Sequence, residues 1–394
     1  MAKRRVLSIA TLYPNAASPR FGTFVARQLE ALAARGDWDV TVVNPIGVPP
    51  LAFGRYRGLK AAAIDGVEHG VQVLRPRFTL IPLFGARWNS KFIVGAVLPL
   101  ARQLHAAAPF DLVDAQFFYP DGPAAARIAK ALGLPLSIKA RGADIQFWSN
   151  KPWARAAMLA AGAQAAGLLA VSEALARDMT ALGLARGKIA IHYTGLDRDL
   201  FHPRQYDGLR AELGKQLALP LANGEVLLAS VGALIPRKGQ EFTIRALAQL
   251  DNARLLLVGK GEDEAKLRAL AMRLGVSERV HFLGSVDHDF LPLVLSAADA
   301  MVLPSRSEGL ANAWVEALAC GTPLVICDAG GARELLGDPS AGRIVARDPQ
   351  AIAAAVLEIV ANPPSPEAVA ANAAQFSWEA NAAALAQYYE RLVA

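Results

Sequence analysis

Cysteine, charge and long hydrophobic runs are all scarce in this 394-residue sequence. Its 2 cysteines, Cys320 and Cys327, do not stand in a metal-like spacing with histidine, so neither a disulfide framework nor a zinc site is expected. We interpret both as small buried hydrophobes. Charged residues make up only 19% of the chain and apolar residues 53%. This composition is that of a globular protein with large cores and does not indicate disorder.

The longest apolar runs, such as 227–234 and 255–258, have the length of a strand, whereas a membrane-spanning helix needs about 18 to 20 residues. A basic cluster at 1–5 precedes a short apolar run without a small-residue cleavage site, which favours a first strand over a signal peptide. We therefore expect no transmembrane segment and a cytoplasmic protein.

The charges are unevenly distributed. Lys and Arg exceed Asp and Glu by 11 over residues 1–203, whereas acidic residues exceed basic ones by 5 over the rest. A basic first part could face anionic lipid, a lipid-phosphate acceptor or nucleic acid, or it could be an ordinary solvated surface.

Short β-rich runs alternate with Ala- and Leu-rich helical patterns, which is typical of parallel sheets covered by helices. A first series of strands is expected at 5–10, 40–44, 71–75, 112–115, 136–140, 167–171 and 188–192, and a second at 225–231, 254–258, 279–283, 300–303, 323–327 and 342–345. Two intervals, 47–71 and 78–91, are interpreted as loops or short helices at a functional edge.

We predict an α/β protein with two doubly wound units in series. The expected boundaries are 1–203, 204–375 and a C-terminal helix at 376–394 that packs back on the first unit, with 193–203 as the link. In such sheets ligands bind outside the carboxyl ends of the strands, here in the crevice that the two sheets face across.

The strand expected at 225–231 is followed by Gly232, Arg237 and Lys238, and a helical pattern begins at 241. A glycine lets a ligand approach the backbone, a helix start supplies oriented N–H groups, and the two cations add fixed positive charge. This arrangement predicts a diphosphate site, although an ordinary turn has the same residues in many proteins.

Two carboxylates, Glu308 and Glu316, stand eight residues apart where another strand leads into a helix. On a helix this spacing places both on nearly the same face. Glu308 is then expected to meet a sugar near the helix start, Glu316 to reach ribose hydroxyls, and the amides of 309–312 to meet phosphate. The alternative is a helix-capping Glu308 and a surface Glu316.

With this motif the chain resembles the retaining glycosyltransferases of family 4, whose second domain carries the E-x7-E pattern. The resemblance extends over nearly the whole length, through 231–234 with 238–239, 257–261, 280–284, 298–299 and 329–331 followed by Glu334. It implies the GT-B fold of two Rossmann-like domains facing a central cleft, and leaving-group stabilisation by basic residues and helix amides without a divalent metal or another cofactor.

The resemblance also implies residue roles in the second domain. Arg237 and Lys238 should face the diphosphate, Glu308 should contact the donor sugar, and Glu316 should bind ribose. The remaining predicted donor-binding residues of this domain are Gly232, Phe282 and Leu283 near the base, and Gly309, Leu310, Ala311 and Asn312. The sequence has Gly232-Ala233 where the family commonly has Gly-Arg. One phosphate contact is therefore expected either to be missing or to be made by Arg237.

In the first domain, Gly22 and Thr23 look like the family's loop facing the donor phosphates and acceptor; an ordinary turn is the alternative. Arg141 stands where many relatives have His, and since it cannot act as a base at neutral pH it is expected to orient Asp144 or a phosphate. Asp144 is counted with the catalytic group. Tyr119 and Ser172, in further strand-end loops, complete the acceptor side. These departures are most similar to teichuronic acid and exopolysaccharide transferases.

The sequence and this resemblance thus predict a retaining transfer of a sugar from a UDP or GDP sugar to a hydroxyl of a lipid-linked glycan, in cell-surface or exopolysaccharide synthesis. The basic first part favours a peripheral place on an anionic membrane surface over nucleic acid, which is not expected as a partner. A nucleotide-sugar epimerase of the same fold and a non-catalytic nucleotide-sugar binding protein are the alternatives.

Overall fold

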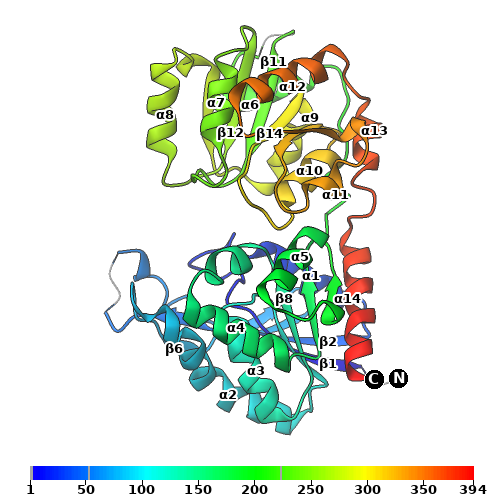
Figure 1. Cartoon of the computed structure of the whole chain (residues 1–394). Coiled ribbons are helices and arrows are strands. Elements are labelled where there is room, and N and C mark those ends of the chain that lie inside the picture. Colours follow the sequence, from blue (N-terminus) through cyan, green and yellow to red (C-terminus); the bar gives the residue numbers. More distant parts are fainter. Residues whose placement is uncertain (1–2, 52–53, 222–223) are drawn as a thin grey trace. The chain divides into compact units, whose positions relative to one another are not determined.

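The computed structural model describes residues 3–51, 54–221 and 224–394. The chain divides into two compact units: Met1–Gly195 together with Trp378–Ala394, and Leu196–Ser377 (Figure 1). The C-terminal helix is therefore part of the first unit, although 182 residues of the second unit precede it in the chain. In the described part of the chain, no helix is long and apolar enough to cross a membrane.

The first unit is built on an eight-stranded sheet with the order β10-β9-β8-β7-β1-β2-β5-β4. Antiparallel pairing joins β4 to β5, and the other neighbours are parallel. The strands are β1 Arg4–Ile9, β2 Trp38–Val43, β4 Gly66–Glu68, β5 Val71–Leu74, β7 Leu112–Ala115, β8 Leu136–Ala140, β9 Gly167–Ala170 and β10 Ile189–Ile191. The order reverses between β1 and β7, so the loops after these two strands open at the switch point where doubly wound sheets bind ligands.

Helices cover this sheet: α1 Thr23–Ala34, α2 Asn89–Ala107, α3 Asp121–Leu132, α4 Pro152–Gln164, α5 Glu173–Leu182 and α14 Trp378–Val393. The last of these, red in Figure 1, packs against α1. Its Leu385 and Tyr389 are fully buried in the core of the first unit. The ring of Tyr389 meets that of Trp38 edge to face, with centroids 5.3 Å apart. Burying such large side chains is what fixes α14 to this unit.

The two intervals expected to be loops or short helices contain more structure than that. Short 3₁₀ helices are present, at Gly54–Tyr56 and Gly85–Trp88, but so are two strands, β3 Ile46–Val48 and β6 Arg77–Thr79, which form a separate parallel pair. The prediction missed these strands and β4 because a three-residue strand is too short to show alternation of apolar and polar residues. Residues 52–53 of the first interval lie outside the described residues.

The second unit contains a six-stranded parallel sheet with the order β13-β12-β11-β14-β15-β16. Its strands are β11 Val226–Val231, β12 Ala253–Val258, β13 Val280–Gly284, β14 Ala300–Leu303, β15 Leu324–Cys327 and β16 Gly342–Val345. Its helices are α6 Leu209–Leu217, α7 Gln240–Leu247, α8 Glu264–Arg273, α9 Leu291–Ala297, α10 Asn312–Ala319, α11 Ala332–Leu335, α12 Pro349–Ala361 and α13 Pro366–Ala371. Here the order reverses between β11 and β14.

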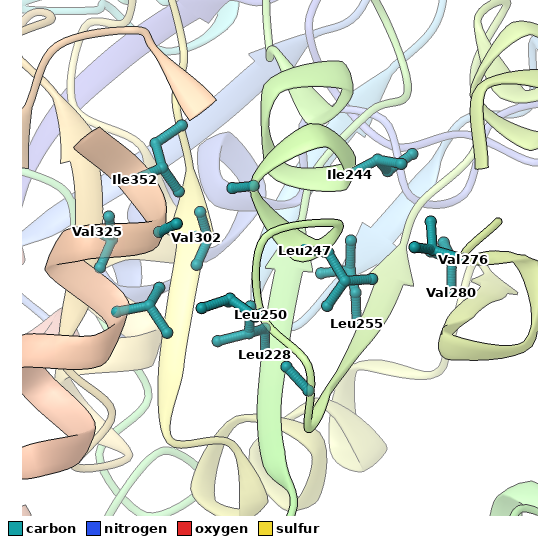
Figure 2. Packing of buried hydrophobic residues seen from close by; sticks show 14 of the residues in the cluster. Leu228, Ile244, Leu247, Leu250, Leu255, Val276, Val280, Val302, Val325 and Ile352 are labelled. Atoms are coloured by element: carbon teal, nitrogen blue, oxygen red, sulfur yellow. The ribbon is translucent and has the colours of Figure 1, made fainter. Parts of the chain in front are cut away.

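The main core of the second unit lies where α7 and α12 cover the sheet (Figure 2). Leu228, Leu255 and Val302 come from neighbouring strands, while Ile244 of α7 and Ile352 of α12 meet them; all five are fully buried. Such strands are apolar throughout because helices cover both faces of the sheet. This packing fixes the positions of the strand ends, and with them the loops that follow β11 and β14.

Candidate functional site

Two loops of the second unit meet at its switch point. The first joins β11 to α7 and carries Arg237 and Lys238, and the second joins β14 to α10 and carries Glu308. Their backbones are linked directly, because the amide of Arg306 donates to the carbonyl of Arg237 over 2.8 Å. The loops follow paired parallel strands, so their meeting is a consequence of sheet order.

The three charged side chains of these loops form one cluster. Lys238 Nζ lies 2.6 Å from Glu308 Oε1, and Arg237 Nη1 lies 3.1 Å from Glu308 Oε2. Arg237 also donates to the carbonyl of Ser307. The Glu308 side chain is only 8% exposed and that of Lys238 13%, whereas Arg237 keeps 32% of its surface. The structure therefore brings together three of the four residues predicted as catalytic.

Opposing influences act on the Glu308 carboxyl. Burial raises its pKa, but the charges of Lys238 and Arg237 lower it, and the balance holds the pKa below its ordinary value of 4.5. Glu308 is thus ionised at neutral pH, and the cluster carries one net positive charge in a partly desolvated place. Such a cluster attracts an anionic group, and the protein dipoles around it need little rearrangement to hold one.

Two glycines allow the backbones to approach closely at this cluster. Gly239 has φ +76°, and a side chain there would place Cβ 2.4 Å from the Pro304 carbonyl oxygen. Gly330 has φ +54°, and its Cβ would lie 2.2 Å from the Glu308 carbonyl oxygen. The next residue, Gly331, donates its N–H to the Gly309 carbonyl over 2.8 Å. The loop after β15 thus supports the Glu308 backbone from a third strand end.

Glu316 lies in a different environment from Glu308. Helix α10 begins only at Asn312, so Glu308 belongs to the preceding loop and only Glu316 is on the helix. The expectation that both acids share one helix face is therefore wrong. The conformation of the loop before α10 determines where Glu308 lies relative to Glu316. His288 Nε2, from the segment before α9, lies 3.5 Å from Glu316 Oε1. The sequence analysis did not single out this histidine.

The other predicted donor-side residues of the second unit lie in two loops and in β13. Gly232 directly follows β11 and donates its N–H to the Val258 carbonyl. Gly309, Leu310 and Ala311 are buried in the loop before α10, and Asn312 opens that helix. These positions agree with a ligand at the strand ends, but their contacts with a donor stay a prediction.

Phe282 and Leu283 lie in β13, in agreement with the strand expected at 279–283, but the Phe282 ring already packs against other side chains of the unit. It packs against the main core of the second unit, and the Arg268 guanidinium lies over it at 4.1 Å from the ring centroid. Because side chains alternate along a strand, Leu283 points to the other face. A base contact here would use Leu283 or the backbone more readily than the Phe282 ring.

In the first unit, Gly22 is the N-cap of α1 and Thr23 is the first residue of that helix. Gly22 is buried and its carbonyl accepts the N–H of Val25, which starts the helix, while Thr23 is exposed as the first helical residue. This is compatible with the ordinary turn weighed above and with a ligand loop, and their donor role stays a prediction.

Asp144 is fully buried after β8 and holds the backbone of neighbouring loops. Its carboxylate accepts N–H groups from Phe118 at 2.8 Å, Gly142 at 2.8 Å, Ile145 at 3.0 Å and Arg141 at 3.0 Å. Burial raises its pKa, while these four donors lower it. The protein's own backbone thus supplies the hydrogen bonds to this carboxylate, and the catalytic role of Asp144 stays a prediction.

The Arg141 side chain does not orient Asp144 as expected. Its Nη2 donates instead to Gln116 Oε1 over 2.5 Å, and its guanidinium lies over the Phe24 ring at 5.0 Å. Only its backbone N–H reaches Asp144. The physical reason is that main-chain donors already satisfy the buried Asp144 carboxylate. The guanidinium instead contacts Gln116, directly after β7, and Phe24 of α1.

Tyr119 and Ser172 are both buried. The Tyr119 hydroxyl donates to the Ala86 carbonyl over 2.6 Å, and its ring packs against Trp148 and Trp153 with centroids 4.9 and 5.4 Å away. Ser172 is the N-cap of α5 and accepts the N–H of Leu175 over 3.1 Å. Both hydroxyls thus serve local structure, and a direct contact of either with an acceptor stays a prediction.

A buried polar group next to these residues was missed. Lys139, in β8, is fully buried, and its Nζ lies 2.7 Å from Gln28 Oε1 and 2.5 Å from His192 Nδ1. Burial lowers the pKa of Lys139 well below its ordinary value. His192 Nε2 in turn lies 2.9 Å from the Asn381 carbonyl of α14. A lysine inside a strand expected to be buried was the signal that could have pointed to this network.

In the described ranges of the chain, no group of three or more His, Cys, Asp or Glu side chains is arranged to hold a metal ion. Cys320 and Cys327 are both free and buried, as expected. Independence from divalent metal stays a prediction of the family resemblance.

Comparison with known families divides the chain at the same region as the structure. Residues 21–200 match Glycosyltransferase Family 4, and residues 216–376 match Glycosyl transferases group 1. The first match falls in the first unit except for its last residues, 196–200, and the second match falls in the second unit.

Two curated relatives show different extents of similarity. A D-inositol 3-phosphate glycosyltransferase of Mycolicibacterium smegmatis is 34% identical over 57% of this chain, which spans only 52% of that relative's length. A protein of Bacillus subtilis named for teichuronic acid biosynthesis, the glycosyltransferase TuaC, is 28% identical over 89% of this chain and 88% of its own.

Solved structures share the fold over almost the entire chain. Sucrose-phosphate synthase from Thermosynechococcus elongatus has a TM-score of 0.78 at 22% identity, covering 99% of both chains. Anabaena HepE in complex with UDP has a TM-score of 0.74 at 20% identity, covering 99% of this chain and 100% of its own. These likenesses confirm the predicted GT-B architecture of two doubly wound domains. With its family 4 domain followed by its group 1 domain, the chain belongs to the glycosyltransferases.

Proposed function

We propose that this protein transfers a sugar from a nucleotide diphosphate donor to a hydroxyl of a glycan acceptor, with retention of anomeric configuration and without a divalent metal. The observation that carries the proposal is the cluster of Arg237, Lys238 and Glu308 at the switch point of the second unit. Two cations and a buried carboxylate on touching loops suit a ligand that carries a diphosphate next to a sugar.

In the proposed reaction, the bond between the sugar's anomeric carbon and the β-phosphate oxygen breaks, and a bond to the acceptor oxygen forms on the same face. The acceptor proton passes to the departing phosphate oxygen. Lys238 and Arg237 stabilise the negative charge that develops on the diphosphate. Glu308 forms ion pairs with both cations, so it is close enough to face the sugar that is attached to the diphosphate. Their mutual ion pairs hold these groups in place before the donor arrives.

The comparisons support the donor class more closely than the acceptor. HepE of Anabaena, which shares the fold, has been solved with UDP and with UDP-glucose. TuaC carries a name from cell-surface polysaccharide synthesis, and on that similarity we propose an acceptor of the same kind, a lipid-linked glycan.

A surface of the first unit supports a membrane-bound acceptor. It consists of exposed aromatic, aliphatic and basic side chains together with the half-buried Lys151, and we call it the aromatic–basic patch: Leu83, Phe84, Arg87, Trp88, Phe147, Lys151 and Trp153. Its two halves adjoin through Tyr119, which contacts Ala86 on one side and Trp153 on the other. Leu83 is 89% exposed and Phe84 81%.

Exposed apolar side chains beside cations suit an anionic membrane surface, because apolar groups enter the interface while cations meet lipid headgroups. We therefore propose that the aromatic–basic patch places the first unit on such a membrane, where a lipid-linked glycan would be presented.

The test begins with the donor. The purified protein is heated with UDP, GDP and their sugars, and one nucleotide series is expected to raise the melting temperature, since a ligand that binds only the folded state stabilises it. Incubation of that donor with acceptor membranes should then release the free nucleotide diphosphate and label a glycan. Binding without release would identify a non-catalytic binding protein, and conversion of the donor sugar without transfer would identify an epimerase. Stabilisation by neither nucleotide would contradict the proposed function.

A further inference from the structure

Arg347 lies in the loop between β16 and α12 and reaches two carbonyl groups at once. Its Nε donates to the Pro304 carbonyl over 2.9 Å, and its Nη2 donates to the Pro236 carbonyl over 2.8 Å. The guanidinium also lies over the Phe242 ring of α7 at 4.6 Å from the ring centroid. It is therefore held in one orientation by an aromatic face and two acceptors.

The two carbonyls belong to the loops that form the charged cluster. Pro236 precedes Arg237 and Lys238, and Pro304 begins the loop that carries Glu308. Arg347 thus bridges the backbones of both loops from a third segment, 39 residues beyond Glu308 in the chain.

The sequence leaves room for this bridge at Gly239. A Cβ there would lie 2.9 Å from Arg347 Nη2, closer than real Cβ atoms approach, and 3.1 Å from its Nε, which is a tight contact. Gly239 therefore lets the guanidinium fit between the loops. An alanine at this position would have to displace either Arg347 or the Pro304 carbonyl.

Two other arginines of the second unit form ion pairs, although Arg343 also donates to the carbonyls of Pro339 and Gly342. Arg343 of β16 pairs with Glu358 at 2.7 Å, and Arg333 pairs with Asp328 at 2.7 Å. These are ion pairs with exposed or half-exposed carboxylates, of the kind that contributes little to stability. The hydrogen bonds of Arg347 go instead to main-chain carbonyls of loops that carry the predicted donor contacts.

We propose that Arg347 is a positioning residue for sugar transfer: it holds the Arg237–Lys238 loop and the Glu308 loop at the separation that donor binding and turnover require. The inference rests on the proposed function. It does not make Arg347 a donor contact, because its hydrogen bonds go to the protein. A planar, two-pronged side chain is needed to span two carbonyls, and a lysine ammonium, as a point donor, can satisfy them only in part.

The test compares Arg347→Ala and Arg347→Lys with Arg343→Ala, which also removes hydrogen bonds to a carboxylate and to two carbonyls, here at the start of β16. A small misplacement of reacting groups lowers turnover by up to about 100-fold. We expect kcat to fall by about 10- to 100-fold in Arg347→Ala, with a smaller change in KM for the donor. Arg347→Lys should lie between this variant and the wild type, and Arg343→Ala should stay within about twofold of the wild type.

Hydrogen exchange provides the readout of positioning. In Arg347→Ala, amide exchange should become faster in both 235–239 and 304–309, and in Arg343→Ala it should remain as in the wild type in these segments. If Arg347→Ala does not fold, Arg347→Lys carries the same comparison. Wild-type kcat together with unchanged exchange in both loops would overturn the inference.

The proposed function fails in a different way. If the wild type binds neither UDP nor GDP in calorimetry, the donor assignment is wrong whatever the Arg347 variants do. If the wild type binds and transfers while Arg347→Ala equals it in kcat, KM and loop exchange, only the positioning role is wrong.

Discussion

Lys238 Nζ and Glu308 Oε1 lie 2.6 Å apart although 70 residues separate them in the chain. The pairing of β11 with β14 brings their loops together, and burial of both side chains makes the ion pair stronger than a surface pair. Removing one partner leaves the charge of the other partly buried and uncompensated. Because the two remaining charges have opposite sign, we expect the two substitutions to affect nucleotide binding and turnover differently.

Lys238→Met should weaken the affinity for the nucleotide diphosphate by about 10-fold or more, because a charge-assisted hydrogen bond contributes about 1.5–3 kcal/mol. Titration calorimetry with UDP and GDP measures this. Lys266→Met is the matched control: Lys266 belongs to the same unit, is 78% exposed and pairs with Asp263. An unchanged affinity in Lys238→Met would remove Lys238 from the diphosphate site.

Glu308→Gln should have the opposite profile. The carboxylate competes with an anionic donor for Lys238 and Arg237, so its loss should leave nucleotide affinity unchanged or raise it. Turnover should fall by about 100-fold or more, as for the removal of a group that stabilises a transition state. Release of nucleotide diphosphate gives turnover, and calorimetry gives affinity. Glu358→Gln, at an exposed ion pair, is the control; retained turnover in Glu308→Gln would contradict the donor-sugar role.

Much of the fold could be predicted from the sequence because buried parallel strands are short apolar runs between helical patterns. The strands at 112–115, 136–140, 300–303 and 342–345 have the predicted bounds. The small strands β3, β4 and β6 were missed, since three residues carry too little periodicity.

The candidate site could be predicted only in part. Arg237, Lys238 and Glu308 stand in recognisable loops at strand ends, so their proximity follows from sheet order. Arg347 belongs to no motif and acts through carbonyl groups, which every residue possesses. The orientation of the Phe282 and Tyr119 side chains could not be predicted either. Packing partners far away in the chain decide on which face each side chain is buried.

The aromatic–basic patch predicts membrane binding that one double variant should weaken. Leu83→Asp with Phe84→Asp replaces two exposed apolar side chains by charges, and binding to vesicles containing anionic lipid should fall by about 10-fold or more. Flotation of the protein with vesicles, with and without anionic lipid, measures this. Met272→Asp, at a residue of the second unit that is 73% exposed, should bind as the wild type does. Equal flotation of the double variant would exclude this patch as the membrane surface.

Asp121 predicts a pH dependence of stability in the first unit. It opens α3, is fully buried, and accepts the N–H and the hydroxyl of Thr11 over 3.0 and 2.7 Å. Burial raises its pKa from 3.8 to about 7. Between these values the unfolded chain releases the proton more readily than the native protein does. The free energy of unfolding should therefore decrease as pH rises from about 4 to about 7, by at most about 4 kcal/mol for this group.

Asp121→Asn cannot titrate, so its stability relative to the wild type should increase over the same range. The amide also loses part of the bonding to Thr11, but that cost is the same at each pH and appears as a constant offset. Denaturant unfolding at about pH 5 and about pH 8 separates the two contributions. Asp37→Asn, at a half-exposed pair with Arg35, controls for the loss of a surface carboxylate. If the difference in the free energy of unfolding between Asp121→Asn and the wild type does not change with pH, the prediction is wrong. The Asp121 carboxyl would then have the same pKa in the native and unfolded states, and its burial at the start of α3 would not disfavour the ionised form.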